Sequence, residues 1–391
     1  MNKFLNSLFK DYQGSLKYLN RGKEFYCGNL IKLLTCSKCI FDEMLCEIKK
    51  ARYKVWLESY IYKLDSVGEQ FRIALIEASR RGCEVTLLCD ALGSWFITKN
   101  FVRTLEDAGV RFIFYNSFEH LNRPFKSLFL RNHRKLLIVD GRVVFCGSAN
   151  IIDCSVKKKP FQDAVVKMIG PVCFGAEENV YNTYYKVLDT EVCHKAPRLT
   201  SYRNGKIICL YECNRAFKLY SLPDLLMKTL QFSKKYCYFI TPYFDPSENI
   251  KLFLLEAAKR GVKIRILTAG ISDVPFMHMA SQCLYEDYIR AGVEIYETYD
   301  CIVHSKVFIS DDKLMLIGSF NLDRISLHNL ELSFGIFDHK NRIEKELEYF
   351  YKILKKSVRI DIKRLQNRSL RERILSKICF YILRGVQKYI Y

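Results

Sequence analysis

The sequence of 391 residues contains no long hydrophobic run. A helix that crosses a bilayer needs about 18 or more consecutive apolar residues, and a typical apolar stretch here, residues 378–383, is ended by Arg384. We therefore expect no transmembrane segment. A secretory signal, with a basic start, an apolar core and a small-residue cleavage site, is also missing from the beginning of the sequence. This absence favours the reducing cytosol as the compartment.

Acidic residues are scarce relative to basic ones. Asp and Glu number 42 against 62 Lys and Arg, which gives a formal net charge of +20. Such a protein attracts anionic partners, and either nucleic acid or an anionic membrane surface fits. Hydrophobic residues make up 49% of the chain, which excludes a disordered or fibrous protein. The length excludes a short disulfide-linked scaffold.

Cysteine is abundant, with 16 residues, but the cysteines are scattered. The densest group is Cys27, Cys36, Cys39 and Cys46, which contains a single Cys-x-x-Cys motif. We do not interpret this group as a metal site, because a structural zinc site needs four ligands at defined spacing. Cys39 and Cys46 lie seven residues apart in a helical pattern, so we expect them to pack as small hydrophobic side chains.

Helical and strand-like segments alternate from residue 40 onward. Residues 53–62 are typical of a buried strand, residues 67–81 of a helix ended by Gly82, and residues 83–90 of the next strand. This alternation predicts an α/β fold with a mostly parallel or mixed sheet that helices cover on both faces.

The second half of the chain repeats the first. The segment RRGCEV at residues 80–85 corresponds to KRGVKI at residues 259–264, and AGV at residues 108–110 recurs at residues 291–293. One such match is a common helix-to-strand junction, but several in the same order indicate two similar lobes.

We place the first lobe at residues 1–197 and the second at residues 198–354. The join lies in the polar stretch at residues 194–206, which contains Pro and Gly. A basic amphipathic segment at residues 355–391 follows the second lobe.

One set of six residues recurs in both halves at the same offsets, 0, 2, 7, 14, 15 and 17. The six are His133, Lys135, Asp140, Gly147, Ser148 and Asn150 in the first half, and His304, Lys306, Asp311, Gly318, Ser319 and Asn321 in the second. Two copies that agree in both residue type and spacing are not accidental.

Local structure explains this spacing. The residues after each histidine are strand-like, and alternate side chains of a strand share a face, so His133 and Lys135 point the same way. Asp140 and Asp311 each begin a turn, after which a second strand returns toward Gly-Ser-x-Asn. The Ser and Asn side chains of each copy can therefore converge on the His–Lys pair.

These side chains suit a phosphate diester. Lysines neutralise the charge of phosphate oxygens, and amides supply oriented hydrogen bonds. One histidine can attack phosphorus while the other protonates the departing alkoxide, which requires imidazoles of differing protonation. A carboxylate can enforce this difference, and Asp163 and Glu331, 30 and 27 residues after the histidines of their own halves, are the candidates. No carboxylate cluster suits Mg²⁺, so we expect neither a metal nor another cofactor.

At these residues the chain resembles the phospholipase D superfamily, whose signature is His-x-Lys-x4-Asp followed by Gly-Ser-x-Asn. The resemblance covers nearly the whole length. It implies two phospholipase D-like lobes whose motifs meet across a pseudo-twofold axis in one site. It also implies that one histidine forms a covalent phosphohistidine and that the other acts first as an acid and then as a base.

Carried over by motif position, the resemblance makes His133 the nucleophile and His304 the acid and base. It implies a phosphate-binding or orienting role for eight further residues, which are Lys135, Lys306, Ser148, Ser319, Asn150, Asn321, Asp163 and Glu331. We count Asp140 and Asp311 with the catalytic motifs and expect a turn-forming, structural role for both.

Within this superfamily the sequence is similar above all to bacterial cardiolipin synthases of the kind that lacks an N-terminal membrane anchor. The similarity is carried by LESYI at residues 57–61, GSFNLD at residues 318–323 and SLHNLE at residues 326–331. It implies attack on phosphatidylglycerol, release of glycerol and transfer of the phosphatidyl group to a second phospholipid alcohol.

Residues 355–391 carry eleven Lys or Arg and two acidic residues, interleaved with aliphatic and aromatic side chains. This pattern predicts either an interfacial helix on anionic lipid or a closing helix packed on the second lobe. Both interpretations can hold for different parts of the segment.

Two classes of function remain open at this point. The leading hypothesis is a phosphatidyltransferase on the inner face of the cell membrane, a peripheral protein and a monomer with an internal pseudo-dimer. A phospholipase D that hydrolyses phospholipids, or a metal-independent phosphodiesterase acting on nucleic acid, would use the same two histidines. The apolar and aromatic residues near the C-terminus favour lipid.

Overall fold

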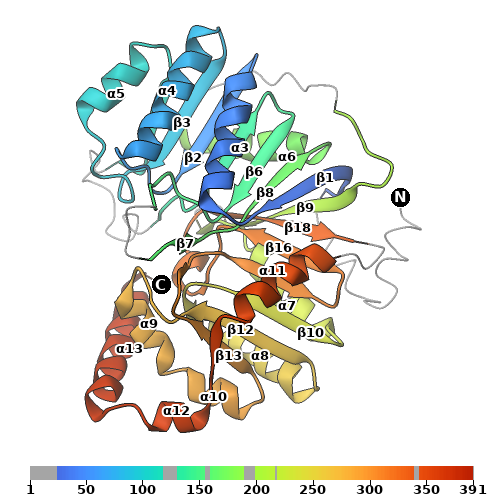
Figure 1. Ribbon diagram of the computed structural model, residues 1–391, viewed down its shortest axis with the longest axis vertical. Helices are drawn as coiled ribbons and strands as arrows, with labels where there is room; N and C mark the ends of the chain where they lie inside the picture. Colours follow the sequence, from blue (N-terminus) through green and yellow to red (C-terminus); the bar gives the residue numbers. More distant parts are fainter. Residues whose placement is uncertain are drawn as a thin grey trace.

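The computed structural model describes residues 24–117, 130–154, 159–188, 199–215, 218–338 and 343–390. The boundary expected at residues 197 and 198 lies outside the described residues. Figure 1 shows an upper lobe built from the first half of the chain and a lower lobe built from the second half.

The first lobe alternates strands and helices as expected. Its strands are β1 (Tyr26–Leu34), β2 (Lys54–Ser59), β3 (Glu84–Asp90), β4 (Arg111–Tyr115), β5 (Leu136–Val139), β6 (Val143–Gly147), β7 (Phe161–Gln162) and β8 (Val165–Ile169). Its helices are α3 (Ser37–Lys50), α4 (Ser66–Arg80), α5 (Lys99–Glu106) and α6 (Val172–Leu188).

The second lobe repeats this order and adds a C-terminal extension. Its strands are β9 (Lys206–Cys213), β10 (Tyr236–Ile240), β11 (Phe244–Asp245), β12 (Lys263–Ala269), β13 (Glu294–Thr298), β14 (Ile302–Val303), β15 (Val307–Ser310), β16 (Leu314–Gly318), β17 (Leu322–Asp323), β18 (Glu331–Phe337) and β19 (Ser357–Ile360). Its helices are α7 (Ser221–Phe232), α8 (Glu248–Lys259), α9 (Pro275–Gln282), α10 (Tyr285–Arg290), α11 (Glu344–Leu354), α12 (Ile362–Gln366) and α13 (Leu370–Ile390).

One continuous sheet of 15 strands joins the lobes, and its order is β19-β13-β12-β10-β15-β16-β18-β9-β1-β8-β6-β5-β2-β3-β4. Read outward from the antiparallel pair of β1 and β9, the two halves have equivalent strands in the same order, and only β19 lacks a counterpart. In each lobe three strands run parallel, β2 with β3 and β4, and β10 with β12 and β13. This arrangement confirms the prediction of two similar α/β lobes around a mixed sheet.

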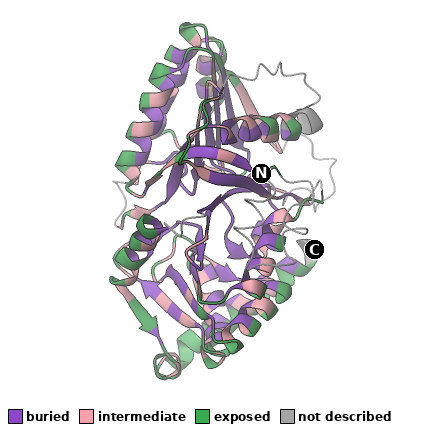
Figure 2. Ribbon diagram, turned by 90° about the vertical axis from the view of Figure 1, so that its right-hand side faces the viewer, coloured by how far each residue is buried: buried purple, intermediate pink, exposed green. Residues whose placement is uncertain are grey.

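Alternation along the strands decides which helices cover each face. In β5, Leu137 and Val139 pack in a core with α3, α4 and α5, whereas Leu136 and Ile138 face a core shared with α6. That second core also contains Phe334 of the second lobe. The lobes are therefore packed on a common hydrophobic core, seen as the buried strands in the middle of Figure 2.

The repeated helix-to-strand junctions form as the sequence predicts. Asp65 caps α4 by accepting a hydrogen bond from the Gly68 N–H, and Ser247 caps α8 in the same way. After each helix the chain turns at a glycine with positive φ, +92° at Gly82 and +86° at Gly261. Glycine adopts this left-handed conformation without the steric cost that a Cβ atom brings.

The cysteine prediction was wrong in part. Cys39 and Cys46 are exposed, while Ile40 and Ile48 of the same helix, α3, are buried. The helical period places the aliphatic side chains toward the sheet, so the cysteines at intervening positions face solvent.

Helix α13 covers the second lobe with one face. Cys379 and Leu383 pack against Met277 and Ala280 of α9, and Figure 1 shows the two helices side by side. This is the packing expected of a closing helix. Within the described residues, no helix combines the length and the apolar character that crossing a bilayer requires.

Candidate active site

The two motifs lie where the lobes meet. In the first lobe β5 runs antiparallel to β2, so the start of β5, just after His133, lies beside the carboxyl end of β2. The His133 N–H donates to the Leu330 carbonyl of the second lobe at 3.0 Å, and the His304 N–H donates to the Gln162 carbonyl of the first lobe at 3.0 Å. Each motif histidine is thus held in place by backbone from the opposite lobe.

The carboxylates are exchanged between the lobes. The Nδ1 atom of His133 lies 3.0 and 3.1 Å from the two carboxylate oxygens of Glu331, and Nδ1 of His304 lies 2.7 Å from Oδ1 of Asp163. Each carboxylate follows the histidine of its own half in the sequence but orients the histidine of the other half in the structure. The residues are the ones expected, but the pairs are His133 with Glu331 and His304 with Asp163.

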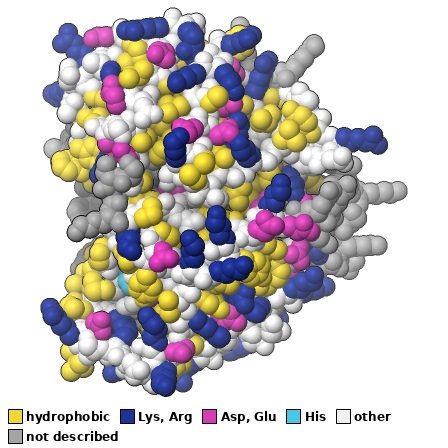
Figure 3. Space-filling model, in the orientation of Figure 1, with side chains coloured by type: hydrophobic (Ala, Val, Ile, Leu, Met, Phe, Trp, Pro, Cys, Tyr) yellow, Lys and Arg dark blue, Asp and Glu magenta, His cyan; other side chains and the backbone are white. Residues whose placement is uncertain are grey.

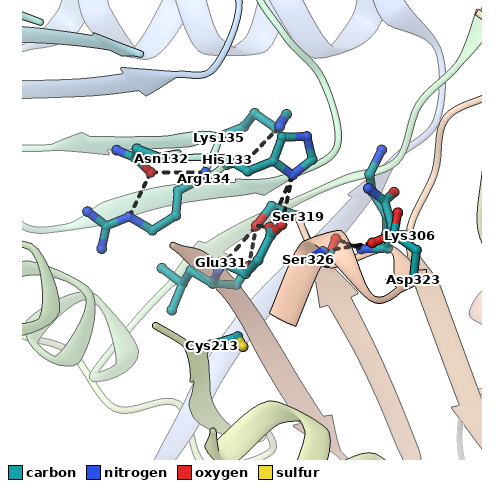
Figure 4. Close-up of polar contacts among 12 residues, drawn as sticks. Asn132, His133, Arg134, Lys135, Cys213, Lys306, Ser319, Asp323, Ser326 and Glu331 are labelled. Carbon is teal, nitrogen blue, oxygen red and sulfur yellow. Dashed lines mark hydrogen bonds and ion pairs between the residues drawn. The ribbon is translucent and has the colours of Figure 1, made fainter. Parts of the chain in front are cut away.

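The motif serines hold these carboxylates. The Ser148 hydroxyl donates to Asp163 at 2.6 Å, and the Ser319 hydroxyl donates to Glu331. Figure 4 shows Glu331 between Ser319 and the His133 ring. Each serine therefore fixes a carboxylate, and through it the imidazole of the other lobe.

The carboxylate contact to Nδ1 leaves Nε2 of each imidazole for chemistry. Burial, together with the nearby Lys135 and Lys306, lowers the pKa of His133 to about 4 against the opposing effect of Glu331. Burial, followed by Lys306, also lowers the pKa of His304, against the effect of Asp163. Both shifts favour the neutral imidazoles in the free protein, and a bound phosphate anion would favour protonation of one of them.

The two motif lysines lie close to the histidines. Their ammonium groups donate to the carbonyl of the histidine in the same motif, Lys135 to His133 and Lys306 to His304, each at 2.6 Å. Burial lowers the pKa of Lys306 to about 8, and burial and the charge of Lys306 bring the pKa of Lys135 well below its ordinary value. A bound phosphate anion would relieve this repulsion and favour the charged lysines.

The motif asparagines are buried beside the same strand ends. The side-chain oxygen of Asn150 accepts a hydrogen bond from the Ile61 N–H at 3.2 Å. The side-chain oxygen of Asn321 is buried and has no partner within the part of the chain that the structure describes. A buried polar atom left in this way favours a role toward a bound group.

The motif aspartates lie away from the histidines. Asp140 and Asp311 follow strands β5 and β15, at the ends opposite the histidines, with φ of 52° and 51°. Asp140 accepts hydrogen bonds from the backbone N–H groups of residues 52–54, and Asp311 accepts them from residues 234–236. This geometry fits the turn-forming, structural role expected for both aspartates. It does not support counting them among the catalytic residues.

Other residues at the site were not singled out from the sequence. The ring centroid of Tyr60 lies 5.0 Å from that of His133, and the ring centroid of Phe161 lies 5.6 Å from that of His304. Burial raises the pKa of Asp323 to about 7. Aromatic residues and a lone aspartate carry no distinctive spacing, so only the folded chain associates them with the motifs.

Buried polar pairs support the segment that carries His133. Arg131 and Asp90 form an ion pair at 2.8 Å, and Arg134 pairs with Glu58 at 3.0 Å. Arg134 thereby points away from the flanking His133 and Lys135, as the period of a strand requires. Among the described residues, no group of three or more His, Cys, Asp or Glu side chains is arranged to hold a metal ion.

Comparisons with known proteins agree with this geometry. The sequence model of a protein family described as "Cardiolipin synthase, PLD-like domain" matches residues 44–166 and 226–354. Cardiolipin synthase from Geobacillus sp. (strain WCH70) is 30% identical over 359 residues, which cover 89% of this chain and 70% of the relative. Cardiolipin synthase B from Escherichia coli (strain K12) is 28% identical over 323 residues, covering 80% of this chain and 77% of the relative.

A solved structure has the same fold. The crystal structure of phosphatidylserine synthase from Haemophilus influenzae Rd KW20 matches with a TM-score of 0.74 at 14% sequence identity. The match covers 97% of this chain and 99% of that one, so both lobes and their arrangement are shared.

Proposed function

Because this chain belongs to the phospholipase D-like family of cardiolipin synthases, whose members are phosphatidyltransferases, we propose that it makes cardiolipin from phosphatidylglycerol. One phosphatidylglycerol donates its phosphatidyl group and releases glycerol, and a hydroxyl of a second phospholipid accepts it. The observation that carries the proposal is the pair of motif imidazoles, each hydrogen-bonded at Nδ1 by a buried carboxylate of the opposite lobe.

In the first step Nε2 of His133 attacks phosphorus. A nitrogen–phosphorus bond forms, the bond from phosphorus to the glycerol oxygen breaks, and His304 donates a proton to that oxygen. A pKa near 4 keeps His133 neutral and able to attack at neutral pH. Glu331 stabilises the positive charge that the His133 ring acquires as the bond forms.

His304 must carry a proton before this step. Its carboxylate partner supports that state, because the buried pair of Asp163 and His304 brings opposite charges together at 2.7 Å. Burial alone would raise the pKa of Asp163, but His304 and the Ser148 hydroxyl outweigh burial and lower it. The negative charge of a bound phosphodiester would further favour the imidazolium.

In the second step the acceptor hydroxyl loses its proton to His304. Its oxygen attacks phosphorus, the nitrogen–phosphorus bond breaks, and His133 returns to its neutral form. Lys135 and Lys306 lie where they can neutralise the phosphate oxygens in both steps. We assign to the amide groups of Asn150 and Asn321 the role of orienting these phosphate oxygens.

The enzyme meets both lipids at a bilayer surface. We assign it to the inner face of the cell membrane as a peripheral, monomeric protein, which agrees with a net charge of +20. Both catalytic histidines come from a single chain, so a monomer already contains a complete site.

Product analysis tests the proposal. Purified protein is given phosphatidylglycerol labelled in its acyl chains, and lipid products are identified by mass spectrometry for wild type, His133→Ala and His304→Ala. We expect wild type to form cardiolipin and glycerol in equal amounts. The two variants should form neither product. Phosphatidic acid alone would identify a hydrolase instead, and cleavage of oligonucleotides without labelled lipid products would identify a nuclease.

A further inference from the structure

Two loops at the sheet edge where the catalytic histidines lie carry exposed hydrophobic side chains. Leu92 and Trp95 follow β3 in the first lobe, and Ile271 and Val274 follow β12 in the second. The two loops are equivalent, since β3 and β12 hold the same place in the two halves of the sheet. We call these four residues the apolar rim.

Contacts place the first part of the rim next to His133. Asp90, the last residue of β3, pairs with Arg131 and accepts a hydrogen bond from the Asn132 N–H at 2.9 Å. Two residues after Leu92, the Ser94 hydroxyl donates to the Tyr60 carbonyl at 3.0 Å, and the Tyr60 ring lies against His133.

The second part of the rim has the equivalent position beside His304. Asp273, between Ile271 and Val274, accepts a hydrogen bond from the Tyr243 hydroxyl at 2.9 Å. Its carboxylate lies within electrostatic reach of His304 and Lys306. Both equivalent loops therefore border the one site, and both present apolar side chains to solvent.

Helix α13 continues this surface. Tyr243 packs against the cluster that joins α9 to α13, and Arg384 of α13 pairs with Asp245 at 2.8 Å. The side of α13 turned away from α9 exposes the apolar residues Leu370, Ile374, Leu375, Ile378, Tyr381, Ile382 and Val386. The basic residues Arg371, Arg373, Lys377 and Lys388 are exposed among and beside them.

We propose that the apolar rim and the outward side of α13 dock together onto a bilayer that contains anionic phospholipid. Trp95 is 74% exposed and Tyr381 is 70% exposed, and such amphipathic rings prefer the boundary between headgroups and acyl chains. On the face that Figure 3 draws, hydrophobic and basic side chains are interspersed over both lobes, and α13 likewise exposes both kinds. This mixture complements an anionic lipid surface, which accepts apolar side chains and cations together.

The inference rests on the proposed function in one respect, since a lipid substrate requires the catalytic edge to face the bilayer. Docking would let the headgroup of a membrane lipid reach the histidines while its acyl chains stay in the membrane. Binding and turnover are separate measurements, so the two proposals can fail independently.

Tryptophan fluorescence of the full-length protein gives a direct test. The chain has two tryptophans, and Trp56 is 3% exposed in the core, so a change on adding vesicles reports Trp95. Vesicles of phosphatidylglycerol and phosphatidylcholine should shift the emission to shorter wavelength, and lipids brominated on their acyl chains should quench it. Unchanged emission from protein that co-sediments with these vesicles would overturn the proposal.

Variants test each part of the surface by vesicle sedimentation. Trp95→Ser combined with Val274→Ser should weaken binding at least about tenfold. Arg371→Ala with Lys377→Ala should weaken binding to anionic vesicles by about fivefold per cation removed, with little effect on pure phosphatidylcholine. Wild-type binding by both variants would refute the proposal.

Two controls separate docking from folding and from catalysis. Ile73→Ser with Leu252→Ser replaces exposed apolar residues on α4 and α8, and it should bind vesicles as wild type does. The rim variant should retain wild-type turnover of a short-chain, monomeric phosphatidylglycerol, whereas His133→Ala should bind vesicles without turnover. A self-association that the rim variant abolishes, with vesicle binding retained, would identify a second copy as the occupant and overturn the proposal.

Discussion

Replacement of Glu331 by glutamine is expected to slow turnover by about 100-fold. Glu331 is fully buried, and both of its oxygens lie near 3 Å from Nδ1 of His133. Glutamine keeps the size and one acceptor oxygen but removes the charge that stabilises the ring during attack. An opposite charge at this range shifts a pKa by 1 to 3 units, or roughly 1.4 to 4 kcal/mol, and the middle of that range corresponds to about 100-fold in rate.

The assay is the initial rate of glycerol release as a function of pH and of phosphatidylglycerol concentration. The loss should fall on kcat, because Glu331 acts on the reaction through Nδ1 of His133. Glu331 opposes the lowering of the pKa of His133, so its removal should also move the acidic limb of the pH profile to lower pH.

Glu297→Gln is a matched control. Glu297 is likewise buried and accepts a hydrogen bond from a histidine, His278, at 2.8 Å, but it lies outside the two motifs. Its substitution should leave both kcat and the pH profile as in wild type. Turnover of Glu331→Gln within about threefold of wild type, with an unmoved acidic limb, would refute the reasoning.

Three further predictions address structure, pH and metal. Asp140→Ala removes the acceptor of three backbone N–H groups and should lower the free energy of unfolding, measured in urea, by about 2 to 3 kcal/mol. Turnover per folded molecule should be retained. A loss of turnover without a loss of stability would contradict this prediction. The pKa of His133 falls from 6.5 to about 4 on folding, so its contribution to stability is present above pH 6.5 and is lost as the pH falls toward 4. The free energy of unfolding should therefore differ less between pH 7 and pH 5 in His133→Ala than in wild type. Overnight dialysis against a chelator should leave activity largely unchanged, and a strong loss restored by a divalent cation would require a metal in the mechanism.

The sequence was sufficient to predict the lobes and the motif residues. The fixed offsets of two motifs indicated a duplicated fold, and the period of a strand placed His133 and Lys135 on one face. Gly82 and Gly261 marked equivalent junctions that the structure contains. These features depend on local geometry, which sequence spacing reports.

The exchange of carboxylates could not be predicted in the same way. Asp163 and Glu331 follow the histidines of their own halves at similar distances, and spacing contains no information about which side of an interface a loop reaches. The backbone hydrogen bonds from His133 to Leu330 and from His304 to Gln162 decide it. Exposure of Cys39 was misjudged for a related reason, because the face of a helix that meets the sheet depends on tertiary packing.

The most direct test of the two-histidine mechanism is the site of the covalent intermediate. Wild-type protein is mixed with phosphatidylglycerol labelled in its phosphate group, quenched in denaturant without acid, digested and mapped by mass spectrometry. The phosphatidyl group is predicted on His133 and on no other residue, with no label retained by His133→Ala. An adduct on His304 would reverse the two roles, and glycerol release without an adduct on either histidine would contradict the covalent mechanism.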